Sequence, residues 1–149
     1  MRTRNALVPI LAVIMLAGAL ALAACGGSDS DSGADTVAID GSWKGTLNGS
    51  GDATFEAYVE IDTLRVGSVS GTVYFPGIGD AGACSGALIY KGRSGSDYLF
   101  TENLVARADP GCIKLGQLRV GSADGGKAIT YSWKAGQNTA VGTLQEWDD

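Results

Sequence analysis

The chain has 149 residues, a hydrophobic content of 45% and a formal net charge of −5. It contains no histidine, which excludes nucleophile systems that depend on a histidine base and also the usual zinc sites. The acidic balance and the lack of a basic cluster argue against nucleic acid as a partner. We therefore expect a binding or structural protein rather than an enzyme, with no cofactor and no metal.

The first 25 residues have the features of a secretory signal. Two arginines form a positively charged start, and an apolar run follows from Ala6 to Leu22. This run is about long enough to span a bilayer, so an uncleaved helical anchor is the alternative. Small residues ahead of Cys25 favour cleavage, and we expect a signal peptide over residues 1–24.

The stretch Leu22-Ala23-Ala24-Cys25 precedes Gly26 and resembles the lipobox of bacterial lipoproteins. The resemblance implies that a diacylglyceryl group, with acyl chains of the palmitate type, is attached to the Cys25 sulfur. It also implies cleavage just before this residue. Two acyl chains anchor a protein stably, because burial contributes about 0.8 kcal/mol per CH₂. The resemblance thus implies a cell-membrane lipoprotein on the extracytoplasmic face, with membrane lipid as its partner.

Residues 25–40 are rich in Gly, Ser and Asp and contain little that can be buried. We expect them to form a flexible, mildly acidic tether. Residues 41–149 then form one domain, which is long enough for a single small core. Loss of the signal arginines takes the formal net charge from −5 to −7, so the domain should stand off anionic lipid.

From Gly41 onward, apolar and polar residues alternate, with frequent interruptions by Gly, Ser, Asn and Asp. This pattern predicts eight strands, at about 41–48, 53–63, 67–76, 82–92, 97–105, 112–120, 127–135 and 139–147. The short, turn-like connections favour antiparallel neighbours. We therefore expect an all-β, eight-stranded antiparallel up-and-down barrel, and a two-sheet sandwich is the alternative.

The second and third predicted strands show the alternation most clearly. In the second strand, one face carries Phe55, Ala57, Val59 and Ile61, and the other face carries Glu56, Tyr58, Glu60 and Asp62. In the third strand, the apolar face carries Val69, Gly71, Val73 and Phe75, and the polar face carries Ser68, Ser70, Thr72 and Tyr74. We expect the apolar sets to face the core, and the carboxylates of the second strand to form a solvated outer face rather than a catalytic pair.

Cys84 and Cys112 remain once Cys25 is assigned to lipid, and in an exported chain they predict a disulfide. Two unlinked thiols are the alternative. In a meander these residues begin the fourth and sixth strands, about 9.6 Å apart with one strand between them, which is too far for a bridge. The bridge therefore requires the fifth strand to stop short and the turn at 109–111 to fold over its end. It would then cross-link one mouth of the barrel.

The opening segment Gly41-Ser42-Trp43-Lys44-Gly45 resembles the start of lipocalin-like and avidin-like barrels, where a Trp beside a Gly packs at the closed end. Further features are Gly71-Thr72-Val73-Tyr74, Cys84-Ser85-Gly86-Ala87-Leu88, Tyr98-Leu99-Phe100-Thr101-Glu102, Cys112 and Ile129-Thr130-Tyr131-Ser132-Trp133. With these, the domain resembles small Cys-paired, lipocalin-like β domains of actinobacterial envelope proteins. That resemblance implies an extracytoplasmic recognition or structural module without assigned chemistry.

Glu102 is the ionisable residue of greatest interest. Alternation places it in line with Tyr98, Phe100 and Leu104, which allows a position inside the barrel. A carboxylate there needs a partner, and Lys114 or Arg119 on the next strand could supply one. Inside, Glu102 either fixes a polar group of a ligand or forms a structural ion pair. A register that turns it outward is the third alternative. The structural alternatives are the more common arrangement.

Four aromatic residues, Tyr58, Tyr131, Trp133 and Trp147, have two interpretations. They either line a ligand-binding mouth or pack in the core and at the barrel ends, and packing is the more common role in small barrels. Tyr131 and Trp133 are the candidate ligand-binding residues beside Glu102.

The segment Ser94-Gly95-Ser96-Asp97-Tyr98 matches the Ser-Gly-x-x-Tyr motif of bacterial lipoprotein inhibitors of c-type lysozyme. The Trp and Lys that should follow soon after the Tyr come only at Trp133 and Lys134.

Taken together, these features lead us to expect a binding, interaction or structural module of the cell envelope. A carrier of a small apolar ligand and an inhibitor of lysozyme or a protease are the alternatives, so an envelope protein is a second possible partner.

Overall fold

The computed structural model describes residues 38–78, 82–104, 112–113 and 115–148. The expected signal peptide, Cys25 and most of the expected tether lie outside these residues. Within the described part of the chain, no helix is both long and apolar enough to cross a membrane.

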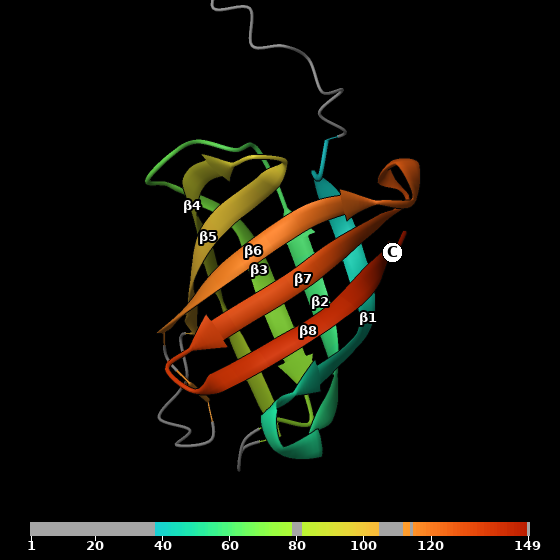
Figure 1. Ribbon diagram of the computed structural model, residues 1–149, viewed down its shortest axis with the longest axis vertical. Helices are drawn as coiled ribbons and strands as arrows, with labels where there is room; N and C mark the ends of the chain where they lie inside the picture. Colours follow the sequence, from blue (N-terminus) through green and yellow to red (C-terminus); the bar gives the residue numbers. More distant parts are fainter. Residues whose placement is uncertain (1–37, 79–81, 105–111, 114, 149) are drawn as a thin grey trace, which may run out of the picture. The chain divides into compact units, whose positions relative to one another are not determined.

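Eight strands form a closed antiparallel barrel in which each strand pairs with its sequence neighbours and β8 pairs with β1 (Figure 1). The strands are β1 (Gly41–Gly49), β2 (Thr54–Ile61), β3 (Val69–Pro76), β4 (Ala83–Ser94), β5 (Asp97–Leu104), β6 (Leu115–Ala123), β7 (Ala128–Ala135) and β8 (Asn138–Glu146). The predicted up-and-down barrel is confirmed, and the two-sheet sandwich is not formed. The β1–β8 pairing closes the sheet, so neither strand is left as an exposed edge.

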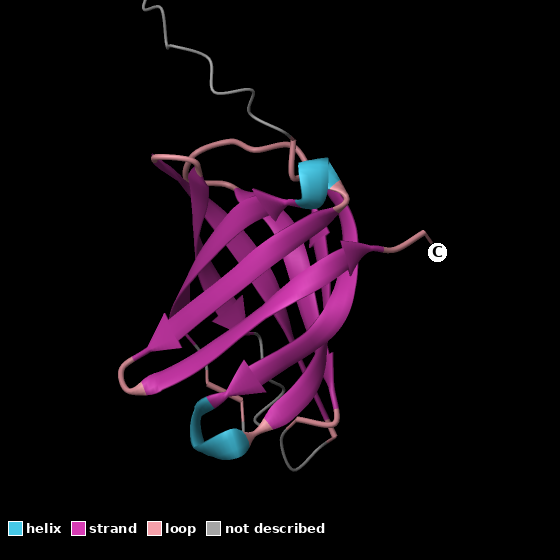
Figure 2. Cartoon of the chain, turned by 45° about the vertical axis from the view of Figure 1, so that its right-hand side comes forward, coloured by secondary structure: helices cyan, strands magenta, loops and turns pink. Residues whose placement is uncertain are grey.

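Two short 3-10 turns lie at opposite ends of the barrel (Figure 2). The turn η1 (Ser50–Asp52) joins β1 to β2, and η2 (Asp124–Gly126) joins β6 to β7. Each contains a glycine in the left-handed region, Gly51 with φ 70° and Gly125 with φ 64°. A side chain is disfavoured in that conformation, which explains why Gly occupies both turns.

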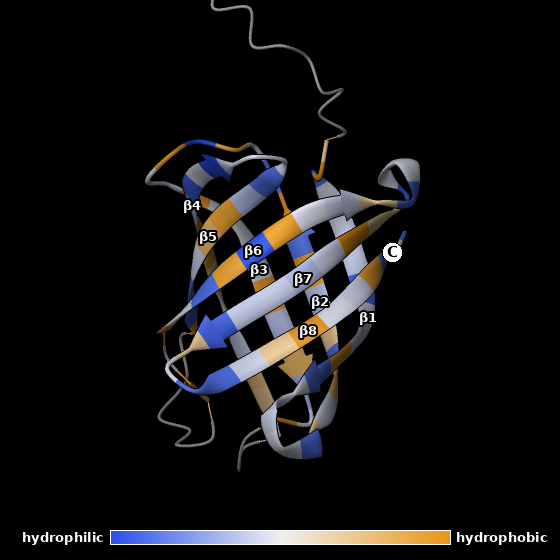
Figure 3. Ribbon diagram, in the orientation of Figure 1, coloured by the Kyte–Doolittle hydropathy of each residue, from blue (hydrophilic) through white to orange (hydrophobic). Residues whose placement is uncertain are grey.

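The period-two pattern of β2 is confirmed by burial. Ala57, Val59 and Ile61 are buried, whereas Glu56 and Glu60 are exposed. The same alternation of hydrophobic and hydrophilic residues is visible along β6 in Figure 3. Inward-facing apolar side chains therefore fill the barrel interior, and the carboxylates of β2 lie on the solvated outer face.

The prediction for the start of the third strand was wrong. Val69 is 63% exposed, and Ser70 is buried at 1%. A register shift between Val69 and Gly71 reverses the alternation, and beyond it Val73 and Phe75 face the core as predicted. The Ser70 hydroxyl is satisfied locally, because it donates to the Ser68 carbonyl at 3.4 Å and accepts from the Arg65 N–H at 3.3 Å.

One end of the barrel is closed by the residues that lead into β1. Ile39 is fully buried, and the Trp43 indole, 2% exposed, donates to the Ile39 carbonyl at 3.0 Å. This contact satisfies the only polar atom of the Trp43 side chain. The hairpins β2–β3, β4–β5 and β6–β7 also turn at this end, which we call the Trp43 end.

The opposite end carries the predicted disulfide. Cys84 and Cys112 are linked, with their Cα atoms 5.8 Å apart. Strand β5 stops at Leu104, and Cys112 precedes the first residue of β6 rather than belonging to that strand, which was predicted to begin at this cysteine. The bridge therefore joins the start of β4 to the chain that leads into β6. The turn predicted at 109–111 lies outside the described residues.

Candidate ligand-binding site

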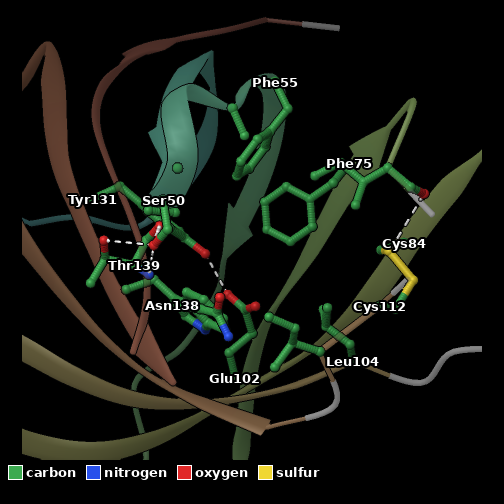
Figure 4. A pocket seen from close by; sticks show the side chains of 16 residues that line it. Ser50, Phe55, Phe75, Cys84, Glu102, Leu104, Cys112, Tyr131, Asn138 and Thr139 are labelled. Carbon is green, nitrogen blue, oxygen red and sulfur yellow. Dashed lines mark hydrogen bonds between the residues drawn. A yellow bond between two sulfur atoms is a disulfide. The ribbon is translucent and has the colours of Figure 1, made fainter. Parts of the chain in front are cut away.

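The disulfide end of the barrel contains a cavity of about 170 Å³. Its walls come from η1 and the residues beside it, the ends of β3 and β5, the starts of β4 and β8, strand β7, and the disulfide (Figure 4). Exposed residues, among them Ser50, Asn138 and Thr139, form its mouth. The described residues leave the cavity open at this end, whereas buried apolar side chains fill the Trp43 end.

The apolar wall of the cavity is built around two phenylalanine rings. Phe55, near the start of β2, and Phe75, near the end of β3, meet edge to face with ring centroids 5.8 Å apart. This is a favourable geometry for aromatic pairs. Cys84 and Cys112 add their sulfur atoms to the same wall, so the disulfide shapes the cavity as well as cross-linking the mouth.

The polar group of the cavity is the Glu102 carboxyl, which is 2% exposed. The Tyr131 hydroxyl donates a hydrogen bond to Glu102 Oε2 (Figure 4). Tyr131 lies on β7 and Glu102 on β5, so the bond spans the barrel interior past β6. Glu102 therefore faces inward, and of the alternatives that the sequence left open the outward register is excluded.

Burial controls the ionisation of this pair. Loss of hydration raises the pKa of Glu102 to about 7, and the hydrogen bond from Tyr131 partly opposes that rise because it stabilises the carboxylate. The pKa of Tyr131 lies well above its ordinary value, since burial and the neighbouring carboxyl both disfavour the phenolate. Tyr131 therefore remains a hydrogen-bond donor at neutral pH, while Glu102 changes charge there.

The partners expected for Glu102 need correction. Arg119 pairs instead with Asp97 at 3.1 Å, and both side chains reach solvent on the outer surface. Alternation explains this, because Arg119 lies between the inward-facing Leu118 and Val120. Lys114 lies outside the described residues. Within the described part of the chain, the carboxyl is held by a phenol and not by an ion pair.

Trp133 contributes a second polar atom beside the cavity. The residue is 8% exposed, and its indole nitrogen is buried without a hydrogen-bond partner among the described residues. The ring covers Gly116 so closely that a Cβ there would overlap the indole. Gly116 lies on β6 and is the cross-strand neighbour of Glu102. The N–H edge of the Trp133 indole therefore lies over β6, beside the residue that pairs with Glu102.

The mouth of the cavity is held by contacts between η1 and β8. The Thr139 N–H donates to the Ser50 hydroxyl oxygen at 2.7 Å, and the two hydroxyl oxygens are 3.2 Å apart. Ser50 and Thr139 are separated by 89 positions in the sequence. These contacts fix one edge of the mouth next to Asn138, which offers an amide at the rim.

The other aromatic candidates lie outside the barrel. Tyr58 contacts Tyr74 and Trp147, with ring centroids 6.0 and 5.3 Å away, and the Lys44 ammonium lies 4.8 Å from the Tyr58 ring. Tyr74 is 46% exposed and Trp147 is 37% exposed. Of the four aromatic residues singled out in the sequence, the cavity brings together only Tyr131 and Trp133.

The segment that resembles the inhibitor motif forms the β4–β5 hairpin at the Trp43 end, away from the cavity. Ser94 is exposed there, and Tyr98 is buried with the Arg93 guanidinium 4.7 Å from its ring. The hairpin therefore presents Ser94 to solvent. Inhibition of a lysozyme or protease stays a prediction.

Among the cavity residues that were not identified from the sequence as site residues are Ser50, Phe55, Phe75 and Thr139. Alternation alone places Phe55 and Phe75 in the core, and their positions near the start of β2 and the end of β3 bring them to the same end of the barrel. The contact between Ser50 and Thr139 has no local sequence signal. Among the described residues there is no cluster of three or more Cys, Asp or Glu side chains that could hold a metal ion.

No protein-family model matches this sequence, and comparison with curated proteins finds no significant match.

Proposed function

We propose that this protein is a lipid-anchored, extracytoplasmic binding protein that holds a small, mostly apolar ligand in the cavity at the disulfide end. The lipid anchor and the location rest on the sequence around Cys25. Binding rests on one observation, the buried Glu102 carboxyl inside a cavity whose other walls are largely apolar or aromatic.

That combination is typical of small-molecule sites, which are mostly apolar with a few placed polar groups that orient the ligand. As a purely structural group, Glu102 is costly, because burying a carboxyl without a cation disfavours folding. A ligand that hydrogen-bonds to the carboxyl gives this residue a function. The mouth that the described residues form provides the path by which such a ligand enters.

The test is a substitution that obstructs the entrance of the cavity. Ala53 is exposed and lines the cavity, so Ala53→Trp should obstruct the entrance without disturbing the core. Ala87→Trp is the matched control, since Ala87 is not part of the cavity lining. Binding of 2-phenylethanol, a small neutral aromatic alcohol, would be measured calorimetrically on the full chain, exported by a bacterial host and reconstituted in nanodiscs.

We expect wild type and Ala87→Trp to bind the alcohol with equal affinity, and Ala53→Trp to bind at least about tenfold more weakly, a difference of about 1.4 kcal/mol. Equal binding by the two tryptophan variants would place the binding site elsewhere and contradict the proposal. A wild-type protein that binds neither this alcohol nor charged molecules of the same shape saturably at millimolar concentration would also contradict it.

A second candidate function, recognition of an envelope protein, is favoured by the outer aromatic cluster of Tyr58, Tyr74 and Trp147. Exposed aromatic side chains are enriched at protein interfaces. A photo-crosslinking residue at Tyr74 should give a discrete product in cells that the same probe at the exposed Ser132 does not. Identical products at both positions would remove this candidate.

A further inference from the structure

The charge of the cavity is unbalanced. Among its described lining residues, Glu102 is the only acidic side chain, and none of them is Lys or Arg. Tyr131 is the only other titratable side chain in this lining, since the two cysteines are bonded to each other. On the neighbouring strands, Glu102 faces Leu88 of β4 and Gly116 of β6, neither of which carries charge. Nothing described in this part of the barrel therefore neutralises the carboxylate.

The carboxyl retains capacity for a donor from a ligand. Tyr131 donates to Oε2, and within the described part of the chain it is the one group that donates to this carboxyl. An ionised carboxylate offers about four acceptor positions on its two oxygens, so Oε1 is available to a ligand. A bound donor that carries positive charge would form the stronger, charge-assisted hydrogen bond.

The aromatic lining favours the same charge. The rings of Phe55, Phe75, Tyr131 and Trp133 border the cavity, and the faces of aromatic rings attract cations. They also provide an apolar surface for a hydrophobic body. The acidic chain, with formal charge −5, adds a long-range field that concentrates cations near its surface and repels anions.

We propose that the cavity selects a protonated organic amine, with a small apolar or aromatic body between the phenylalanine rings and an ammonium group paired with Glu102. This inference rests on the proposed function and names its ligand class. A carboxylic acid would bring a second negative charge beside Glu102. A neutral alcohol fits the walls but leaves the carboxylate without a countercharge.

The test compares three molecules of the same shape and different charge: 2-phenylethylamine, 2-phenylethanol and phenylacetate. Dissociation constants would be measured calorimetrically on the full chain in zwitterionic nanodiscs, with empty nanodiscs as blanks. At pH 8 we expect the amine to bind at least about tenfold more tightly than the alcohol, because only the amine forms the ion pair, and phenylacetate to bind most weakly.

Two variants that each remove one negative charge distinguish an effect of Glu102 itself from an effect of the net charge of the protein. Glu102→Gln should reduce amine affinity to that of the alcohol, while Glu60→Gln, on the exposed outer face of β2, should leave the preference intact. Lowering the pH to 5.5 should also weaken amine binding, since Glu102 with a pKa of about 7 becomes protonated while the amine remains charged.

The outcomes distinguish this inference from the proposed function. If the alcohol binds through the mouth as tightly as the amine, or if Glu102→Gln keeps the amine preference, the amine inference is overturned and the binding function stands. If none of the three molecules binds saturably at millimolar concentration, both are overturned.

Discussion

The Tyr131 hydroxyl donates its hydrogen bond to the Glu102 carboxyl from a position 29 residues further along the chain and two strands away in the barrel. The pair is the polar centre of a mostly apolar interior. Under the proposed function it orients the ligand, and its ionisation makes the stability of the fold depend on pH.

Replacing Glu102 by Gln should stabilise the protein at pH 8 and have little effect at pH 4. The folded-state pKa of about 7 lies above the ordinary value of 4.5, so the protonated carboxyl is favoured by folding. Wild-type stability is then fully present below pH 4.5 and falls as the pH rises to about 7, by up to ~3 kcal/mol. The variant keeps an acceptor for Tyr131 and does not ionise. Denaturant unfolding at both pH values measures the difference.

Glu60→Gln is the control for that experiment, because Glu60 is exposed and its replacement should change stability by less than about 0.5 kcal/mol at either pH. A Glu102→Gln variant that is no more stable than wild type at pH 8 would contradict the prediction. It would show that a group outside the described cavity lining stabilises the buried carboxylate.

Tyr131→Phe should raise the pKa of Glu102 above about 7, since the hydrogen bond from the phenol stabilises the carboxylate and lowers this pKa. The same change should cost about 1–2 kcal/mol of folding free energy, the usual range for a buried hydrogen bond. Carbon-detected NMR of the glutamate carboxyl through a pH titration measures the first effect. An unchanged midpoint would mean that the bond does not form in solution.

Replacing Cys84 and Cys112 by Ser should destabilise the barrel by about 3–4 kcal/mol, because the bridge closes a loop between residues 28 positions apart. The cavity should also lose ligand affinity, since both sulfur atoms form part of its wall. Thermal unfolding of oxidised wild type, reduced wild type and the double variant distinguishes the effect of losing the disulfide from the effect of replacing the cysteine side chains. The reduced protein should unfold near the temperature of the double variant.

Gly116→Ala should be disruptive although Gly116 is not in a left-handed conformation. The added Cβ would overlap the Trp133 indole, and overpacking of this kind costs about 1–3 kcal/mol. A double-mutant cycle with Trp133→Phe isolates the contact. If the smaller ring does not relieve the loss of unfolding free energy, the damage arises from the backbone and not from the indole.

Cys25→Ser should abolish labelling by an alkyne analogue of palmitate in a bacterial host, because the hydroxyl does not replace the thiol as the lipid acceptor. The Cys84→Ser, Cys112→Ser double variant should still be labelled. Labelling of Cys25→Ser at the wild-type level would contradict lipidation at this residue and with it the proposed anchor.

Much of the fold follows from local pattern. Alternation in β2 placed Ala57 and Val59 inside, because a residue and its second neighbour point to the same face of a strand. The same rule failed at Val69, where a bulge inserts one residue and reverses the faces. A bulge depends on how two strands pair, which local sequence does not express.

The candidate site was only partly predictable for the same reason. Alternation put Glu102 in line with Phe100 and Leu104 but left its inward and outward registers open. Arg119 was the wrong partner because alternation turns it outward to Asp97. The partner that Glu102 has, Tyr131, lies on β7, which is not a neighbour of β5 in the sheet. Contacts across the barrel interior depend on its diameter and on the rotamers of the side chains.

The sequence by itself determined the strand pattern, the antiparallel order and the pairing of the two domain cysteines, because alternation, turn composition and cysteine number are local or countable properties. Only the tertiary structure decided that Glu102 meets Tyr131, that Trp133 covers Gly116, and that the described residues leave a cavity beside the disulfide. Those features arise from closing the sheet into a barrel, which brings together side chains from strands distant in the chain and leaves space wherever their volumes do not fill the interior.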